Sequence, residues 1–402
     1  FYTQNQIDSF NDNYPNCTEI GGDVYIGTFN GSDITNLTGL NSISSIGGKL
    51  DINNNPNLTS LAGIENISFI GDDLTIIQND SISNLNELNS LTLINGNLSL
   101  SGKYLINFSG LDNITQIYGD LNISNNDLIY NLSGLENLET IHGNLTISHN
   151  SNLIDFDGLG NLSNIMGNVK IEGNNSLIDF SGLGNLISIG DYVDIRANNN
   201  LINFSGIGFL DTIQSLSIRE NDSLLNFEGF EGLKHVKTII DIYGNPLIED
   251  FSGFQSLNSI GTKLNIMLSD KLQNLSGLES LTFIGNGLRI SNNSMLSELN
   301  SLNNLDSIGG IIFIFNNNSL QSLAGLNNFD ASFLDQLSVY NNPYLSVCEV
   351  KSVCDFIALQ TGFVEIYGNA FGCHNQEAVE QACHVTAIND IILAPDFLIF
   401  PN

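Results

Sequence analysis

The sequence predicts a β-solenoid, a right-handed coil of about fifteen similar units with one parallel β-sheet face and 3₁₀ or irregular connections. The stretch NLSGLENLETIHGNLTISHN (131–150) has Leu or Ile every three residues and then alternates, and DFDGLGNLSNIMGNVKIEGN (155–174) repeats this skeleton 24 residues later. Anchored on the first apolar residue of the alternating segment, thirteen of the fourteen spacings are 23 to 26 residues and the last is 27. A fixed period of this length indicates a repeat array rather than separate globular domains.

Each unit begins with a short predicted strand. In Leu145-Thr146-Ile147 apolar residues alternate with a polar one, so Leu145 and Ile147 are expected inside and Thr146 outside. One such strand cannot bury its face alone, but stacked copies share a continuous core. The fifteen anchors are Val24, Leu50, Leu74, Leu98, Leu121, Leu145, Val169, Val193, Leu216, Ile240, Leu264, Leu288, Ile312, Leu337 and Val364.

An asparagine follows the anchor by five residues in twelve of the fifteen units. An inward amide at this point can satisfy backbone groups that are freed where the strand ends, and it can bond the next Asn along. We therefore interpret these residues as structural. They are Asn55, Asn79, Asn126, Asn150, Asn174, Asn198, Asn221, Asn245, Asn293, Asn317, Asn342 and Asn369.

Beyond the Asn, apolar residues fall three apart, as in Leu58, Leu61 and Ile64. This spacing predicts short 3₁₀-like turns or tight corners rather than an α-helix. A glycine precedes many of these apolar positions, where it permits a positive φ or close packing between coils. The glycines are Gly63, Gly134, Gly158, Gly182, Gly206, Gly229, Gly253, Gly277 and Gly325.

Both ends of a repeat array need covers, because their strand edges are otherwise unpaired. We expect an N-terminal cap over residues 1–23 and a repeat solenoid over 24–343. Residues 344–384 are the expected C-terminal cap, in which CEVKSVCDFIALQTG has helical spacing and leads into a last strand, FVEIYGN.

Four of the five cysteines lie in the predicted C-terminal cap: Cys348, Cys354, Cys373 and Cys383. Clustered cysteines beside a body that otherwise lacks them predict disulfides in an oxidising compartment. Zinc is the alternative, but no C-x2-4-C pair is present. The sequence leaves the connectivity and the state of Cys17 open.

The charge balance excludes some classes of partner. The chain has 11 Lys+Arg against 43 Asp+Glu, a formal net charge of −32, which repels nucleic acid and anionic membrane surfaces. No run of 18 apolar residues is present, so we predict no transmembrane segment. A chain that opens on Phe1 suggests a mature form whose leader was removed.

No motif in the chain supplies the converging titratable groups that catalysis needs. The five histidines are scattered, and there is no P-loop, no G-x-S-x-G and no dinucleotide-binding motif. Loops such as Asn53-Asn54-Asn55 offer oxygen ligands for Ca²⁺, but no EF-hand or calcium-binding nonapeptide repeat supports this. We therefore predict a protein that is not an enzyme, with no cofactor and no metal site.

The outward positions of the strands form the surface through which solenoids bind. Each unit has three of them: one before the anchor, one after it and one after the next apolar residue. Early units place small polar residues there, such as Asn144, Thr146 and Ser148. Later units place cations and large apolar residues there, and we predict that these form a binding face: Lys170, Arg196, Arg219, Tyr243, Lys263, Met267, Arg289, Phe313, Phe315, Tyr340 and Tyr367.

The residue types of this face favour a partner, because aromatic residues and Arg carry much of the binding energy at protein interfaces. Six of the eleven cations also lie at outward strand positions, namely Lys49 and the five cations of this face. The alternative is architectural: Arg196 could pair with Glu172 and Arg219 with Asp194 across strands, and the aromatic rings could stack on one another or be covered by the cap.

The repeat GLENLETIHGNLTISHN (134–150) resembles the leucine-rich, receptor-L-domain-like repeats of secreted Bacteroidetes proteins. The segment from Cys348 to Cys383 resembles their C-terminal cap. FLIFPN (Phe397–Asn402) resembles the YPNP opening of the C-terminal sorting domain of the type IX secretion system. The resemblance implies a type IX cargo that is secreted or exposed on the outer membrane, in which 385–402 is a linker towards a missing sorting domain.

Four D-[ST]-aliphatic triplets resemble the O-glycosylation motif of that phylum, with Ser81, Thr212, Ser223 and Ser307 as the candidate residues. The resemblance also suggests the function. We expect a recognition or adhesion protein (an adhesin) that binds a protein partner through the strand face. The alternative is a glycan-capture protein in an outer-membrane uptake complex, although the absence of Trp counts against a flat sugar platform.

Overall fold

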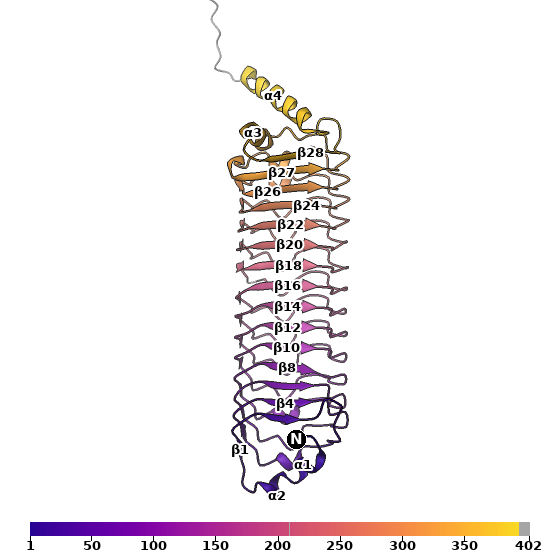
Figure 1. Ribbon diagram of the computed structural model, residues 1–402, viewed down its shortest axis with the longest axis vertical. Coiled ribbons are helices and arrows are strands. Elements are labelled where there is room, and N and C mark those ends of the chain that lie inside the picture. Colours follow the sequence, from indigo (N-terminus) through magenta and orange to yellow (C-terminus); the bar gives the residue numbers. More distant parts are fainter. Residues whose placement is uncertain (209, 394–402) are drawn as a thin grey trace, which may run out of the picture. The chain divides into compact units, whose positions relative to one another are not determined.

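The computed structural model describes residues 1–208 and 210–393, with side chains up to residue 384. The chain divides into two compact units, Phe1–Leu224 and Leu225–Asn402. Each is a parallel β-solenoid, and the two contain about 14 turns in total. Within each unit the long strands are stacked in the order of the sequence (Figure 1). No helix among the described residues is long and apolar enough to cross a membrane.

The long strands are the alternating segments that the sequence predicts. In the first unit they are β2 (Val24–Ile26), β4 (Leu50–Asn53), β6 (Leu74–Ile77), β8 (Leu98–Ser101), β10 (Leu121–Ser124), β12 (Leu145–Ser148), β14 (Val169–Glu172), β16 (Tyr192–Arg196) and β18 (Ser215–Arg219). In the second they are β20 (Ile239–Tyr243), β22 (Lys263–Met267), β24 (Gly287–Ser291), β26 (Gly310–Phe315), β27 (Leu334–Tyr340) and β28 (Phe363–Tyr367).

The inward and outward faces of these strands are as predicted. Leu145 and Ile147 are fully buried, whereas Thr146 between them is only partly covered. The parallel register pairs Leu145 with Val169 and Ile147 with Ile171, so the buried positions of successive coils stack directly. All fifteen anchors lie within long strands, which confirms the predicted repeat.

A second set of parallel strands, each two residues long, is not evident from the sequence pattern. They fall at the end of each run of three-spaced apolar residues, as at Phe69–Ile70, and two residues are too few to display an alternation. In the first unit these are β1 (Glu19–Ile20), β3 (Ser45–Ile46), β5 (Phe69–Ile70), β7 (Leu93–Ile94), β9 (Gln116–Ile117), β11 (Thr140–Ile141), β13 (Asn164–Ile165), β15 (Ser188–Ile189) and β17 (Thr212–Ile213). In the second they are β19 (His235–Val236), β21 (Ser259–Ile260), β23 (Phe283–Ile284) and β25 (Ser307–Ile308).

The connections contain the predicted 3₁₀-like turns. The Ile64 N–H donates to the Leu61 carbonyl at 3.2 Å, and the Ile67 N–H donates to the Ile64 carbonyl at 3.1 Å. Such bonds between residues three apart place every third side chain in the core. Five turns are regular enough to be 3₁₀ helices: η1 (Thr38–Leu40), η2 (Asn86–Leu88), η3 (Asn300–Leu302), η4 (Ala324–Leu326) and η5 (Ala331–Phe333).

The mid-unit glycines serve both predicted purposes. Gly63 has φ +113, and a Cβ atom there would lie 2.0 Å from the Leu37 carbonyl oxygen of the preceding coil. Gly325 lies outside the left-handed region, yet its Cβ would meet the Leu299 oxygen at 1.8 Å. The close approach of neighbouring coils therefore requires glycine at both positions. In most units a positive φ is a second reason for glycine.

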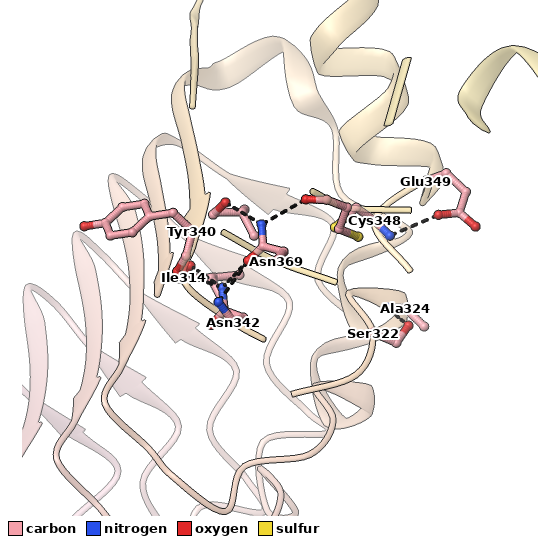
Figure 2. Close-up of a disulfide and its surroundings, with 10 residues drawn as sticks. Ile314, Ser322, Ala324, Tyr340, Asn342, Cys348, Glu349 and Asn369 are labelled. Atoms are coloured by element: carbon pink, nitrogen blue, oxygen red, sulfur yellow. Dashed lines mark hydrogen bonds between the residues drawn. A yellow bond between two sulfur atoms is a disulfide. The ribbon is translucent and has the colours of Figure 1, made fainter. Parts of the chain in front are cut away.

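The asparagines that follow the strands form a buried ladder. The backbone N–H and the side-chain Nδ2 of Asn150 donate to Oδ1 of Asn174 at 3.0 and 3.2 Å, and Nδ2 also donates to the Ile123 carbonyl at 3.1 Å. Figure 2 shows the last step, where Asn342 donates to Asn369. The structural interpretation of these residues is confirmed.

The residue just before each ladder asparagine adopts a left-handed backbone. At this position, and at the equivalent place before Ser269, φ lies between 54° and 58° for ten residues other than glycine, among them Asn54, His149 and Leu268. His149 is exposed at this turn. A leucine in this conformation is strained because its Cβ approaches the following carbonyl oxygen.

Helices lie at both ends of the chain. At the start, α1 (Gln4–Asp8) and α2 (Phe10–Asn13) bury Ile7 and Phe10. Towards the end lie α3 (Lys351–Leu359) and α4 (Gln376–Leu393). Two disulfides, Cys348–Cys373 and Cys354–Cys383, join these C-terminal segments, as the sequence predicts, while Cys17 is a free thiol.

One predicted boundary differs from the structure. The sequence analysis ends the C-terminal cap at residue 384 and starts a linker at 385, but α4 continues through this point to Leu393. No glycine or proline lies between 376 and 393, so nothing in this segment interrupts the helix. The rest of the predicted linker, including FLIFPN, lies outside the described residues.

The ladder makes a prediction for stability. Asn150→Ala leaves the Ile123 carbonyl and the Asn126 N–H without their partner in the core. Because each buried unpaired group costs about 1–3 kcal/mol, we expect the free energy of unfolding to fall by about 2–4 kcal/mol. Chemical denaturation measures this change.

Asn137→Ala is the matched control. Its Nδ2 also donates to a neighbouring coil, at the Asp112 carbonyl, but the side chain is exposed and water can replace it. The expected loss is below about 1 kcal/mol. Equal losses from Asn150→Ala and Asn137→Ala would show that burial of the ladder contributes nothing.

The left-handed turn makes a second prediction. Leu268 has φ 57° and an exposed side chain, and Asn occupies the equivalent place in Asn292 and Asn316. Leu268→Asn should raise the free energy of unfolding by about 0.5–1 kcal/mol, because Asn tolerates this conformation better. The same substitution at Leu128, an exposed leucine with φ outside that region, should give no gain in thermal or chemical denaturation.

Candidate functional site

The outward residues of the long strands form files in the second unit because the strands are parallel and in register. The last outward position runs Tyr243, Met267, Ser291, Phe315, Tyr340 and Tyr367. The middle position places Arg289 beside Phe313. Large side chains that are 24 or more residues apart in sequence thus become neighbours.

Three of these side chains and one cation form a continuous stack, which we call the aromatic row: Arg289, Phe315, Tyr340 and Tyr367. The ring centroids of Phe315 and Tyr340 are 4.9 Å apart, and those of Tyr340 and Tyr367 are 5.0 Å apart, with interplanar angles of 11° and 5°. The Arg289 guanidinium lies 5.2 Å from the centroid of Phe315. The aromatic rings therefore stack on one another. This is one of the two architectural alternatives given above for them, the other being cover by the cap.

The stack determines which parts of the rings face solvent. Phe315 has Arg289 near its ring and Tyr340 stacked on it, and Tyr340 lies between Phe315 and Tyr367. The central rings therefore present their edges outward, and the Tyr340 hydroxyl points away from the strand (Figure 2). Of the row, Tyr367 is the most open ring, at 44% exposed.

The hydroxyl of Tyr340 remains protonated over the physiological range. Partial burial raises its pKa, the neighbouring Tyr367 and Glu365 raise it further, and Arg289 opposes them without reversing the shift. A neutral phenol both donates and accepts hydrogen bonds, so the row offers polar tips on an apolar body.

The other predicted residues of the second unit surround this row. Lys263 is exposed, while Tyr243, Met267 and Phe313 are partly covered. Ser291 also occupies an outward strand position, yet it is fully buried, and its hydroxyl has no partner among the described residues. Larger neighbours on the flanking strands cover such a short side chain.

The predicted cations of the first unit lie in a charge cluster. Lys170 and Arg196 both contact Glu172, at 2.6 and 2.7 Å, and Arg196 lies 3.9 Å from Asp194. Arg219 is exposed and pairs in register with Arg196. The pairing of Arg196 with Glu172, given above as the architectural alternative, is present. These cations belong to a different unit from the aromatic row.

Polar residues at the strand starts of the first unit form a second ladder that sequence reasoning missed. The N–H of Asn144 donates to Asp120 Oδ1 at 2.7 Å, and that of Asn168 donates to Asn144 Oδ1 at 2.8 Å. The recurrence of Asn or Asp one residue before the anchor is the signal that could have revealed it. These outward residues are therefore engaged with one another.

A polar groove of about 530 Å³ borders the aromatic row and was also missed. Its lining includes Asn292, Asn316 and Asn341, which directly follow Ser291, Phe315 and Tyr340 in sequence. Asn316 Nδ2 donates to Asn292 Oδ1 at 3.1 Å. In sequence these asparagines are typical of turns, so the pattern gave no sign of a shared groove.

Within the described residues, no group of three or more His, Cys, Asp and Glu side chains could hold a metal ion. His142 stacks on Tyr118, and His235 contacts the Ser259 hydroxyl at 2.9 Å. Of the glycosylation candidates, Ser81 is exposed and donates to the Pro56 carbonyl. Thr212 and Ser307 lie on short strands and are partly covered, as is Ser223.

The sequence profile of the Receptor L domain matches residues 113–178. A solved TLR13–ssRNA13 complex is similar to the chain at 17% identity and a TM-score of 0.33, over 86% of this chain and 64% of that one. A leucine-rich repeat protein from Bacteroides eggerthii DSM 20697 is similar at 15% identity and a TM-score of 0.37, over 85% and 62%. The chain thus spans less than two thirds of the length of either.

No curated protein matches the sequence significantly. The Receptor L domain profile thus matches one segment of the chain, and the described residues form a leucine-rich-repeat-like parallel β-solenoid. Nothing in the described residues indicates catalysis.

The charge cluster predicts a pH dependence. Burial of the Glu172 carboxylate raises its pKa, but hydrogen bonds from Lys170 and Arg196 outweigh burial and hold the pKa below its ordinary value. The carboxylate thus stabilises the fold above the unfolded-state pKa, and this contribution disappears as pH falls through the folded-state pKa. Glu172→Gln should therefore cost up to about 1 kcal/mol at pH 7.

Denaturation at pH 7 and again below the pKa of Glu172 measures this difference. Wild type and Glu172→Gln should converge in acid, where the native carboxyl is also neutral. Asp355→Asn is the control, because its pair with Lys351 is far more exposed and should contribute little at either pH. A gap between wild type and Glu172→Gln that persists in acid would contradict the charge-based explanation.

Proposed function

We propose that this chain is a non-enzymatic recognition or adhesion protein that binds a protein partner through the aromatic row of its second unit. The observation that supports this is the row itself, in which Arg289, Phe315, Tyr340 and Tyr367 lie side by side on a rigid parallel sheet. Partly exposed aromatic rings with an adjacent Arg have the composition of an interface hot spot.

The rigidity of the sheet supports binding energetically. Each ring is already held by its neighbours on the next strand, so little side-chain freedom is lost when a partner docks. The polar groove beside the row provides amide and hydroxyl groups at its rim. An apolar centre bordered by hydrogen-bonding groups is the usual anatomy of a protein–protein interface.

The glycan-capture alternative has less support from the geometry. A sugar that stacks on an aromatic side chain needs an open ring face, because that is where the π-density lies. The faces of Phe315 and Tyr340 are occupied by their neighbours, and the chain contains no Trp. A protein partner can instead use ring edges and the phenolic hydroxyls.

A secreted or outer-membrane surface-exposed location is part of this proposal. Two disulfides favour an oxidising compartment. The repeat resembles those of secreted Bacteroidetes proteins, which supports a type IX cargo from that phylum and O-glycosylation at residues such as Ser81. Attachment of the protein to an outer-membrane complex is consistent with this proposed location.

Phe315→Ser combined with Tyr340→Ser tests the proposed face. Loss of two adjacent hot-spot rings should weaken capture of the partner from a native cell-surface extract by at least about tenfold. The midpoint of thermal unfolding should change little, because both side chains lie outside the core. A glycan array run with the same two proteins separates the alternatives.

Thr146→Ala combined with Asn122→Ala is the control, since both are outward strand residues of the first unit and are remote in sequence from the row. This control should bind like wild type. Undiminished capture by the Phe315/Tyr340 variant would reject the face. A glycan signal that is lost in that variant would favour glycan capture instead.

A further inference from the structure

A stripe of exposed apolar residues runs along the first unit, away from the strand face. It occupies one repeat position, the residue that follows the first buried apolar residue after the Asn ladder. The stripe consists of Ile106, Tyr130, Ile154, Ile178 and Ile202, which are 51%, 59%, 37%, 41% and 39% exposed. Tyr104 and Leu128, at 51% and 36%, widen it at one end.

Backbone hydrogen bonds join four of the five stripe residues, Tyr130 to Ile202, into a file. The Ile154 N–H donates to the Tyr130 carbonyl at 2.9 Å, Ile178 donates to Ile154 at 3.0 Å, and Ile202 donates to Ile178 at 2.9 Å. Successive residues are therefore spaced as neighbouring strands are, about 4.8 Å apart, and the five span about 19 Å.

The architecture does not require apolar residues at this position. In the second unit the same position holds Glu249, Gln273, Ser297 and Gln321, and these make the same bonds at 3.0–3.1 Å from one coil to the next. In the first unit the position before the stripe is Ser83, which accepts from the Ile106 N–H at 3.0 Å. Polar side chains thus serve equally well in the ladder.

Apolar residues are consequently concentrated in adjacent coils where solvent alone would favour polar ones. A contiguous exposed apolar patch on a protein surface usually marks an interaction site. Leu225, the first residue of the second unit, continues the pattern in sequence. The stripe is therefore a surface feature that binding explains and folding does not.

Carboxylates border the centre of the stripe. Asp155 and Asp179 directly follow Ile154 and Ile178, and Asp157 is exposed two residues beyond Asp155. Burial raises the pKa of Asp155, a hydrogen bond from the Asp157 N–H partly offsets this, and the nearby charges of Asp157 and Asp179 raise it further. These like charges repel one another, and a cation placed among them would relieve that repulsion.

Cations are sparse near the stripe. Lys103 lies at the widened end, with its ammonium 5.7 Å from the Tyr104 ring. Asp127 is exposed and precedes Leu128 in sequence. An apolar file with acidic borders is complementary to an apolar file with basic borders. A matching partner therefore carries a row of apolar residues flanked by Lys or Arg.

We propose that the stripe is a second interaction surface, which binds a cationic amphipathic helix of a partner protein along the file from Ile106 to Ile202. A helix presents apolar residues every three to four positions, and about thirteen residues span the same 19 Å. Its Lys and Arg residues, on either side of the apolar face, would lie against the Asp residues.

A second copy of this chain is a poorer occupant. Two copies would bring their acidic borders together, and the chain has a net charge of −32. Like charges placed opposite each other at an interface oppose association. The stripe is separate from the aromatic row, so this surface and the proposed function can be tested independently.

The test uses the full chain and a synthetic amphipathic helix of Leu and Lys, about 18 residues long. Two further probes are a scrambled peptide of the same composition and a Leu/Glu peptide of the same pattern. Fluorescence anisotropy at physiological salt gives the affinities. Ile154→Ser with Ile178→Ser removes the centre of the stripe and keeps every charge.

Ile187→Ser is the matched control, because Ile187 is 58% exposed in the same unit but occupies a different repeat position. The stripe variant should fold normally, since Ser83 and Ser297 occupy the same position in other coils. Thermal unfolding verifies this for both variants.

We expect the Leu/Lys helix to bind wild type and Ile187→Ser equally and the stripe variant at least about tenfold more weakly. The scrambled and Leu/Glu peptides should bind weakly or not at all. Equal binding by the stripe variant would overturn the proposal, because net charge alone would then explain it. A wild-type dimer that the stripe variant loses would also overturn it, in favour of self-association.

Discussion

The buried Asn ladder is the interaction on which the rest of the structure depends. Each turn of a solenoid must end its strand and change direction inside the core, where an unpaired N–H or carbonyl is costly. One amide side chain resolves this problem, because Asn150 donates to Ile123 and Asn174 and accepts from Asn126. Where an Asn is present, the ladder thus joins a coil to its neighbours and fixes their register.

Fixed register has a consequence for every other position. Residues about 24 apart in sequence become stacked neighbours, so any residue type that recurs at one repeat position becomes a file. The same geometry produces the Asn ladder inside, the Asp/Asn ladder at the strand starts and the aromatic row outside. The inward files are constrained by packing, whereas the outward files are free to vary and so can acquire function.

The variable files differ between the two units. The first unit has hydrogen-bonded polar residues and a neutralised charge cluster on its strand face, and its apolar stripe lies elsewhere. The second unit has the aromatic row on its strand face and, from Glu249 onwards, polar residues at the position of the stripe. The same repeat architecture therefore carries two chemically distinct surfaces, each confined to a few adjacent coils.

The period, the inward strands and the structural asparagines could be predicted from the sequence, because each is a short local pattern that recurs in the repeats. The cysteines of the cap could be predicted because they are clustered in a short segment. The sequence also identified the aromatic residues of the strand face, but not that their rings cover one another. The burial of Ser291, the shared contact of Lys170 and Arg196 with Glu172, and the groove lined by Asn292 and Asn316 depend on how the coils stack. The short strands, the continuation of α4 and the exposed stripe likewise became visible only in the tertiary structure, because exposure and pairing depend on contacts between coils rather than on any single repeat.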